Sequence, residues 1–169
     1  MNIQFLPLTS ENMLKFKEQI VSSEFCYPEN IRSSYDEYVE IVTAPGSLSM
    51  LAFADGQYVG NVMAAPLSEE ECTELKVNYD PKTSIYIYNL VVCPQFQGKG
   101  LGSVLIKEFI KKCYNQGFNL ITGHFRMNGS FHLVNKMGAE IKAVEHNWED
   151  TNEDYVFCEL KMPLLVCKA

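Results

Sequence analysis

The stretch that decides the fold of this chain is residues 90–102, LVVCPQFQGKGLG. It joins an apolar segment, residues 84–93, to a segment of helical period that begins at Gly100. β-branched and aromatic residues fill the first segment, as in a central buried strand. Apolar residues in the second segment recur at the spacing of an amphipathic helix, at Leu101, Val104, Leu105, Ile106, Phe109, Ile110 and Cys113. The stretch therefore predicts a strand, a glycine-rich turn and a helix.

Three alternate glycines, Gly98, Gly100 and Gly102, stand where this helix begins. They let backbone N–H groups approach a ligand without obstruction by a Cβ atom. The N–H groups of a first helical turn have no partner within the helix, and they carry the positive end of the helix dipole. The turn therefore predicts an anion pocket suited to a pyrophosphate, and Lys99 can add positive charge at its rim.

Two other glycine-rich signatures fit this turn poorly. A P-loop requires G-x-x-x-x-G-K-[ST], but a glycine follows the pair Gly98-Lys99, and Cys93 occupies the position of the leading glycine. The dinucleotide fingerprint G-x-G-x-x-G, counted from Gly98, ends at Ser103. That fingerprint also requires an acidic residue further along the chain, and residues 119–122 supply none.

The rest of the chain predicts a mixed α/β sheet. Its other predicted strands are residues 2–8, 47–54, 58–66, 119–125, about 140–148 and about 155–162. Three further helices are predicted: one that Ser10 caps at its start, one over about residues 30–43 and one near residues 130–137. Residues 67–83 are predicted to form a long loop or a short helix. The step Asp55-Gly56 predicts an antiparallel hairpin. The β-α-β-α-β order from residue 84 predicts some parallel pairing.

Composition and charge predict one soluble domain over residues 1–169. A hydrophobic fraction of 47% and a charged fraction of 21% are those of a globular protein with a sizeable core. The formal net charge of -7 disfavours binding to nucleic acid or to an anionic membrane, because such a chain is repelled by phosphate groups.

The chain has six cysteines, and their spacing helps to predict the cellular compartment. They form no C-x-x-C pair and do not alternate with histidine at zinc-ligand spacing, so no metal is expected. Residues 1–10 lack a basic region followed by an apolar run, so we expect no signal peptide. No stretch approaches the roughly 20 apolar residues that span a bilayer. Free thiols in a reducing cytoplasm are the simplest interpretation.

Residues 90–102 resemble the pattern of the Gcn5-related N-acetyltransferase (GNAT) family, hydrophobic-x-Val-x-Pro followed by [Gln/Arg]-x-x-Gly-x-[Gly/Ala]. The order of predicted elements agrees with that family over nearly the whole chain. The resemblance implies the acyl-CoA N-acyltransferase fold, a mixed, mostly antiparallel central sheet with a splayed parallel strand pair and flanking helices. It also implies direct transfer of an acetyl group from acetyl-CoA to a primary amine, in a small molecule or a peptide, within a ternary complex.

The resemblance further implies where acetyl-CoA binds. Backbone groups of Leu90, Val91 and Val92 would hold the pantetheine arm like an added strand. Residues 126–139 resemble the next block of the family, in which Asn128 fits with an offset of one residue. The pyrophosphate would lie on the backbone amides of Gln97, Gly98, Lys99, Gly100, Leu101, Gly102 and Ser103.

Two departures from the family pattern leave the catalytic groups open. The family often uses a Tyr in that second block to protonate the departing CoA thiolate, and Val134 stands in its place. A thiolate, with a thiol pKa near 8.5, can leave without a fixed acid or with another donor. The alternative is a non-catalytic acyl-CoA-binding regulatory domain, and we expect the working enzyme.

The general base is the second open role. Some members place a Glu on the central strand, where this chain has Tyr86, with Tyr88 and Asn89 nearby. Tyr86 or Tyr88 could relay a proton through water, although both could simply be core or groove-lining aromatics. These three residues are the catalytic candidates.

Weaker candidates each have a plainer interpretation. His124 could be a base or a packed or solvated histidine, and Glu24 could line the acceptor site or be a solvated helix-end carboxylate. Cys93 suits a small buried residue. The acidic run of residues 69–71 could attract a cationic amine or simply face solvent. Many members of the family pair through their last strands, so the resemblance allows a homodimer. The apolar tail, residues 163–167, could cover such an interface or simply extend a strand.

Overall fold

The computed structural model describes residues 1–162, and the apolar tail, which could cover a dimer interface or extend a strand, lies outside them. Its strands are β1 (Ile3–Pro7), β2 (Met50–Ala54), β3 (Gln57–Ala65), β4 (Ser84–Val92), β5 (Leu120–Arg126), β6 (Glu140–Glu145) and β7 (Tyr155–Lys161). Its α-helices are α1 (Ser10–Lys15), α2 (Lys17–Ser23), α3 (Tyr35–Thr43), α4 (Glu69–Leu75), α5 (Leu101–Asn115) and α6 (Phe131–Lys136). Short 3-10 helices are η1 (Glu24–Cys26), η2 (Glu29–Ile31), η3 (Pro94–Phe96) and η4 (Trp148–Asp150).

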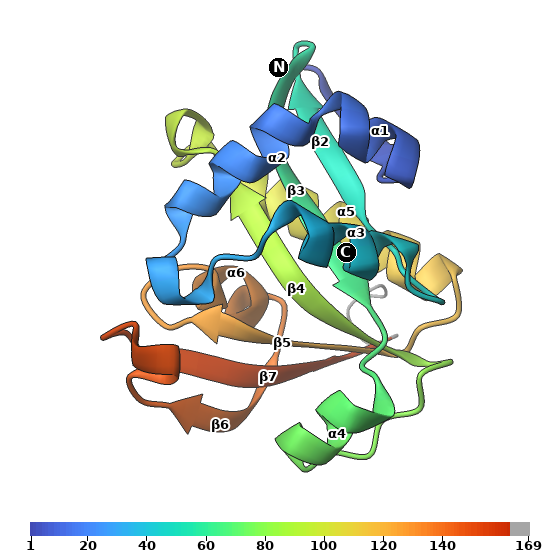
Figure 1. The fold of residues 1–169 in the computed structure, drawn as a ribbon, viewed down its shortest axis with the longest axis vertical. Coiled ribbons are helices and arrows are strands. Elements are labelled where there is room, and N and C mark those ends of the chain that lie inside the picture. Colours follow the sequence, from blue (N-terminus) through green and yellow to red (C-terminus); the bar gives the residue numbers. More distant parts are fainter. Residues whose placement is uncertain (163–169) are drawn as a thin grey trace.

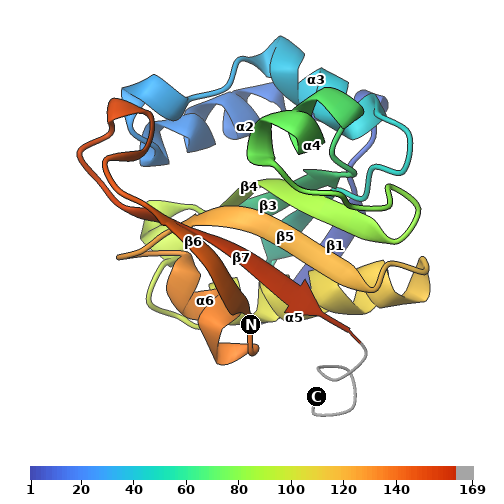
Figure 2. The ribbon, with the colours of Figure 1, turned by 90° about the horizontal axis from the view of Figure 1, so that it is seen from below.

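The strands form one sheet in the order β1-β2-β3-β4-β5-β7-β6, with helices on both faces. Helices α1 to α4 lie on one face, and α5 and α6 lie on the other (Figure 1, Figure 2). The pair β4–β5 is parallel, and every other neighbouring pair is antiparallel. The predicted mixed, mostly antiparallel sheet is therefore the observed one.

Local signals set the helix boundaries, with two corrections to the prediction. The N-cap of the first helix is Thr9 rather than Ser10, because the Thr9 and Asn12 side chains form a capping box. The predicted helix over residues 30–43 begins only at α3, because Ser34 and Glu37 form a second capping box there. The acidic segment after β3 contains the short helix α4, which Ser68 caps in the same way.

Two apolar layers hold the helices to the sheet. On one face, Phe109 and Ile106 of α5 are fully buried in a cluster with Ile85 and Ile121 of the sheet. On the other face, residues of α1, α2 and α3 pack on β2 and β3 in a second cluster. Each fully buried aliphatic or aromatic side chain contributes roughly 1.5–3 kcal/mol through the apolar area it removes from water.

The sheet opens between its two parallel strands. β4 pairs with β5 only from Ser84 to Ile87, yet β4 continues to Val92 and β5 continues to Arg126. The two strands therefore separate toward their carboxyl ends, as the family resemblance implied. Where they separate, the facing backbone groups of the two strands no longer bond to each other.

A bulge in β4 sets which side chains face each side of the sheet. The register with β3 passes from Met63↔Asn89 to Ala64↔Ile87, so Tyr88 is the extra residue. As a result, Tyr88 follows Tyr86 on the side of α4, and Asn89 hydrogen-bonds to α3 on that same side. The residues Ile85, Ile87, Leu90 and Val92 pack toward α5.

Candidate active site

A groove with a volume of about 670 Å³ lies where β4 and β5 separate. One end reaches the glycine-rich turn and the start of α5, and the other end reaches η1 and η2. The walls come from the end of β4, the end of β5 and α6. One continuous space therefore joins the predicted cofactor segment to residues on the opposite face of the sheet.

The glycine-rich turn shapes the first end. Gly98 and Gly100 have φ angles of +77° and +79°, and a Cβ atom at either would lie in open space. Such φ angles are strained for residues other than glycine. Gly100 is the N-cap of α5, and no side chain caps this helix. The first N–H groups of α5, from Leu101 to Ser103, are therefore available to an anion at the groove.

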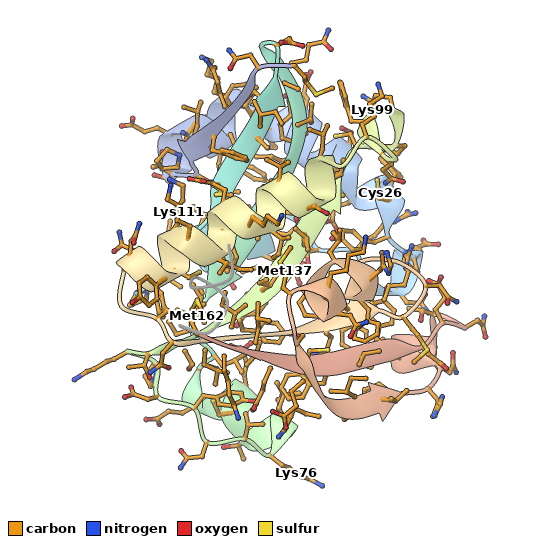
Figure 3. The ribbon with its side chains drawn as sticks, turned by 180° about the vertical axis from the view of Figure 1, so that it is seen from behind. Cys26, Lys76, Lys99, Lys111, Met137 and Met162 are labelled. Carbon is orange, nitrogen blue, oxygen red and sulfur yellow. The ribbon has the colours of Figure 1, made fainter. Side chains whose placement is uncertain are left out.

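Every predicted cofactor-binding residue lines this groove except Lys99. The Lys99 ammonium lies 5.6 Å from the centroid of the Phe96 ring, and the side chain is at the outer end of the turn (Figure 3). Besides His124, the basic side chains that line the groove are Arg126, His132 and Lys136. Sequence reasoning missed the two on α6, whose spacing of four residues was the only signal of a shared face.

The open edge of β4 is satisfied by two side chains. The Tyr27 hydroxyl donates to the Leu90 carbonyl at 3.0 Å and accepts from the Leu90 N–H at 3.3 Å. The Gln97 side-chain amide donates to the Val92 carbonyl at 2.8 Å. These backbone groups belong to the strand edge that the resemblance assigned to the pantetheine arm. A ligand that binds there as an added strand must take over these hydrogen bonds.

Val134 does not face the groove. Its side chain is 1% exposed and packs in the core beneath α5, whereas its neighbour Leu133 lines the groove. The position where the family often has its Tyr acid therefore supplies neither an acid nor a groove contact.

Glu24 is the most perturbed acid at the second end of the groove. It is 5% exposed, so the interpretation as a solvated helix-end carboxylate is wrong. Its carboxylate accepts from the Ser33 N–H at 2.6 Å and from the Asn89 side-chain amide at 3.3 Å. Burial raises the pKa of Glu24 to about 7, and the Ser33 hydrogen bond and the Arg32 charge oppose that rise. A carboxyl with this pKa can accept a proton near neutral pH.

Asn89 is held in place beside Glu24. Its side-chain amide also donates to the Tyr38 hydroxyl of α3 at 2.8 Å. Its buried side-chain oxygen has no hydrogen-bond partner among residues 1–162. A buried acceptor without a partner is uncommon, and this one belongs to a residue that lines the groove.

The other two catalytic candidates have their hydroxyl groups engaged. The Tyr86 hydroxyl lies 2.7 Å from Nδ1 of His124, and the Tyr88 hydroxyl donates to Glu71 of α4 at 2.6 Å. Burial raises the pKa of both tyrosines. Burial also lowers the pKa of His124 to about 4, and its ring stacks on Trp148 at 4.7 Å between centroids. His124 is therefore a packed, neutral histidine beside the groove.

The loop between β6 and β7 closes the second end. Trp148 of this loop lines the groove, and Asn30 of η2 donates to the carbonyls of Glu149 and Asp150 at 3.2 and 2.7 Å. Figure 2 shows this loop beside the segment that follows α2. Four of its residues have left-handed backbone conformations, namely Asn147, Glu149, Asp150 and Asn152. Strained backbone of this kind is concentrated at functional sites.

Other features of the described residues bear on the class of site. The cysteines at 26, 72, 93, 113 and 158 are free thiols, and Cys93 is buried at the end of β4, as expected. Within residues 1–162, no group of three or more His, Cys, Asp or Glu side chains could hold a metal ion. In the same part of the chain, no helix has both the length and the apolar character needed to cross a membrane.

Comparison with known proteins identifies the family of the chain. A sequence profile of the Acetyltransferase (GNAT) family matches residues 16–138. The chain therefore belongs to the GNAT family, and the family resemblance drawn from residues 90–102 is confirmed. Among curated protein sequences, none is detectably similar to the chain.

Solved structures confirm the fold. The ribosomal-protein-S18-alanine N-acetyltransferase from Escherichia coli has a TM-score of 0.71 at 15% identity, over 96% of each chain. yncA from Salmonella typhimurium, solved with its cofactor acetyl-CoA, has a TM-score of 0.73 at 15% identity, over 96% of this chain and 95% of that one. NAA60 from Arabidopsis thaliana, in complex with acetyl-CoA, has a TM-score of 0.70 at 21% identity, over 95% of this chain and 99% of that one.

Proposed function

We propose that residues 1–169 form a single N-acetyltransferase domain that transfers the acetyl group of acetyl-CoA to a primary amine by direct attack within a ternary complex. One observation carries this proposal. A single groove joins the uncapped start of α5 and the open edge of β4 to a buried carboxyl group with a pKa of about 7.

The cofactor end fits acetyl-CoA on the geometry of this chain. The N–H groups of residues 101–103 would hold the pyrophosphate, and the positive φ angles of Gly98 and Gly100 leave the approach to them open. The backbone of Leu90 and Val92 would hold the pantetheine arm, once Tyr27 and Gln97 have released it. Acetyl-CoA supplies an activated acetyl thioester. Solved relatives that contain acetyl-CoA support this assignment.

The acceptor end would prepare the amine. Glu24 is the best-placed base, because a pKa of about 7 allows it to take a proton from an ammonium group, directly or through water. Asn89 would orient the amine through its unpartnered side-chain oxygen. The amine nitrogen then forms a bond to the thioester carbonyl carbon, the carbon–sulfur bond breaks, and CoA leaves as a thiolate, while the nitrogen gives up its second proton to solvent. With Val134 in the core, that thiolate would take its proton from solvent or from another donor.

Tyr86 and Tyr88 have secondary roles in this proposal. Tyr86 forms a hydrogen-bonded pair with His124, which could pass a proton along the wall of the groove. His124 itself is a poor base at neutral pH, since its pKa is about 4. Tyr88 is tied to Glu71 and would mainly shape the acceptor wall.

Thermal unfolding with and without acetyl-CoA tests the cofactor site. A ligand that binds only the native state raises its melting temperature. We expect a rise for the wild type that is lost in Gly100→Glu, whose new side chain would enter the approach to the α5 N–H groups. Gly56→Glu is the matched control, because Gly56 has a similar φ angle of +82° and open surroundings at the hairpin between β2 and β3.

The outcomes separate three possibilities. A rise in the wild type and control but not in Gly100→Glu supports the cofactor site, and a screen of amines for release of CoA follows. Binding without CoA release from any amine would favour the non-catalytic acyl-CoA-binding regulatory domain. No rise at saturating acetyl-CoA, CoA or a longer acyl-CoA would overturn the proposal.

Compartment and assembly are further parts of the proposal. Free thiols are typical of a reducing compartment, which supports a cytoplasmic location. β6 is an edge of the sheet next to β7, so two copies could pair through the last strands, and the mass in solution tests this.

A further inference from the structure

The acceptor end of the groove holds two opposite charges that do not pair with each other. Glu24 comes from η1 and Arg126 from the end of β5, and both side chains line the groove. Among residues 1–162, Arg126 forms one ion pair, from its Nε atom to Glu153 at 3.3 Å. Glu153 is the one acidic side chain paired with this guanidinium in the described part of the chain, and a guanidinium has further N–H donors for a second anion. A guanidinium fork matches the geometry of a carboxylate.

Tyr155 adds a second polar group on the Arg126 side. It lies directly opposite Arg126 in the β5–β7 register, and it also lines the groove. Tyr155 is 3% exposed, and its hydroxyl makes no hydrogen bond of normal geometry within the part of the chain that the structure describes, although it lies close enough to Arg126 to affect the pKa of that guanidinium. Buried hydroxyl groups almost always have a partner. A ligand group beside Arg126 would supply one.

The Glu24 side has a matching unpartnered group. Asn89 is 3% exposed, it donates to the Glu24 carboxylate, and its own side-chain oxygen has no partner among the described residues. A carboxyl group and an amide oxygen at one point are acceptors suited to the N–H groups of an amine. The groove therefore offers acceptors at Glu24 and Asn89, and donors at Arg126 and Tyr155.

The surface between these groups is aromatic. Tyr86 and Tyr88 contact each other with ring centroids 4.7 Å apart, and Trp148 contacts Tyr155 at 4.6 Å. All four line the groove. Such a wall favours an apolar or aromatic substituent. Hydrogen bonds from Asn30 join η2 to the loop between β6 and β7. This link narrows the end of the groove, which favours a small acceptor.

From these groups we infer that the acceptor is a free α-amino acid with an apolar or aromatic side chain. Its amine binds Glu24 and Asn89, its carboxylate binds Arg126 and Tyr155, and its side chain packs on the aromatic wall. This inference rests on the proposed N-acetyltransferase function and names the substrate class of that site.

The test compares apolar and aromatic L-amino acids with their own amides, for example L-phenylalanine and L-phenylalaninamide, by the rate of CoA release. The amide keeps the amine and the side chain but lacks the negative charge. Its amine loses a proton more readily, so a preference for the acid must come from recognition. We expect at least one acid to exceed its amide about tenfold or more in kcat/KM, as one charge-assisted contact allows.

Three variants locate the origin of this preference. In Arg126→Gln, kcat/KM for the acid should fall to the level of the amide, while the value for the amide stays within about twofold. Tyr155→Phe should raise KM for the acid about tenfold without lowering the melting temperature, because the hydroxyl it removes makes no hydrogen bond of normal geometry within residues 1–162. Lys112→Gln should change neither substrate, since Lys112 pairs with Glu108 on α5 at 3.7 Å and does not line the groove.

Several results would overturn the inference. Equal or better activity on the amides, acetylation only of amines that lack a carboxylate, or an equal loss on acid and amide in Arg126→Gln would each do so while leaving the N-acetyltransferase proposal intact. A rise in KM for acetyl-CoA in Arg126→Gln would assign Arg126 to the cofactor end instead. Failure of every amine in the panel and in a wider screen would remove the proposed function and, with it, this inference.

Discussion

The hydroxyl group of Tyr27 lies against the backbone of Leu90, donating to its carbonyl at 3.0 Å and accepting from its N–H at 3.3 Å. Tyr27 thus completes the edge of β4 at the point where this strand has left β5. In the proposed function, the pantetheine arm takes the same two backbone groups. Tyr27 and the cofactor then compete for one strand edge, and the Tyr27 side chain must move away from Leu90 when acetyl-CoA binds.

Removal of the Tyr27 hydroxyl should strengthen acetyl-CoA binding. Tyr27→Phe leaves the Leu90 backbone without its side-chain partner, which destabilises the free protein relative to the complex by about 1 kcal/mol. We expect the Kd for acetyl-CoA to fall about fivefold in isothermal titration calorimetry. Tyr114→Phe on the exposed side of α5 is the control. Weaker binding in Tyr27→Phe would mean that this hydroxyl contacts the cofactor rather than competing with it.

The rate should follow the ionisation of Glu24. Because the base must be deprotonated, kcat/KM of the wild type should rise with pH to a plateau with an apparent pKa near 7. Glu24→Gln should lower kcat on the order of a hundredfold and remove that limb of the profile. Acetyl-CoA binding, measured calorimetrically, should be unchanged. A limb near pH 7 that persists in Glu24→Gln would assign the base elsewhere.

Glu24 and His124 should give stability opposite dependences on pH. The folded pKa of Glu24 is raised to about 7, so its contribution to stability is complete below the unfolded value of 4.5 and is lost as pH rises toward 7. The folded pKa of His124 is lowered to about 4, so its contribution is complete above the unfolded value of 6.5 and is lost as pH falls toward 4. In the wild type the two dependences largely cancel between pH 4.5 and 6.5.

Single substitutions should reveal each dependence. The free energy of unfolding of Glu24→Gln should rise with pH over this range, and that of His124→Asn should fall. Each change should be on the order of 2–3 kcal/mol, since a shift of one pKa unit corresponds to about 1.4 kcal/mol. Urea unfolding at a series of pH values measures both. Slopes of the same sign in the two variants would contradict the assignment of either pKa.

Gly60 should be the least replaceable glycine of the sheet. A Cβ atom at Gly60 would lie 2.2 Å from the backbone oxygen of Val91 on the neighbouring strand β4. Backbone cannot yield as a flexible side chain does, so Gly60→Ala should destabilise the fold by about 3 kcal/mol or more. The control Gly56→Ala meets no atom within 4 Å and should cost only about 1–2 kcal/mol for its positive φ angle. Equal losses in urea unfolding would show that the two strands can separate at Gly60.

Local patterns were enough to predict much of the cofactor end. The change of hydrophobic period around residues 90–102 predicted β4, the glycine turn and α5, because period and helix capping depend on residues only a few positions apart. Gly98 and Gly100 were informative since their positive φ angles are a property of the single residue. Lys99 shows the limit, because the direction of a side chain on a turn depends on its surroundings.

The acceptor end depended on tertiary structure. Glu24 and Asn89 are 65 positions apart, and the burial that raises the Glu24 pKa exists only when η1 packs over β4. Arg126 and Tyr155 become neighbours through the β5–β7 register, which no short pattern predicts.

The sequence by itself determined the order of the strands, the helix α5, the family and the segment proposed to hold the cofactor, since each follows from residue type and short-range spacing. The tertiary structure alone decided which titratable groups are buried, which edge of β4 is open, and which side chains meet in the groove. Desolvation and contact between distant residues arise only when the chain is folded.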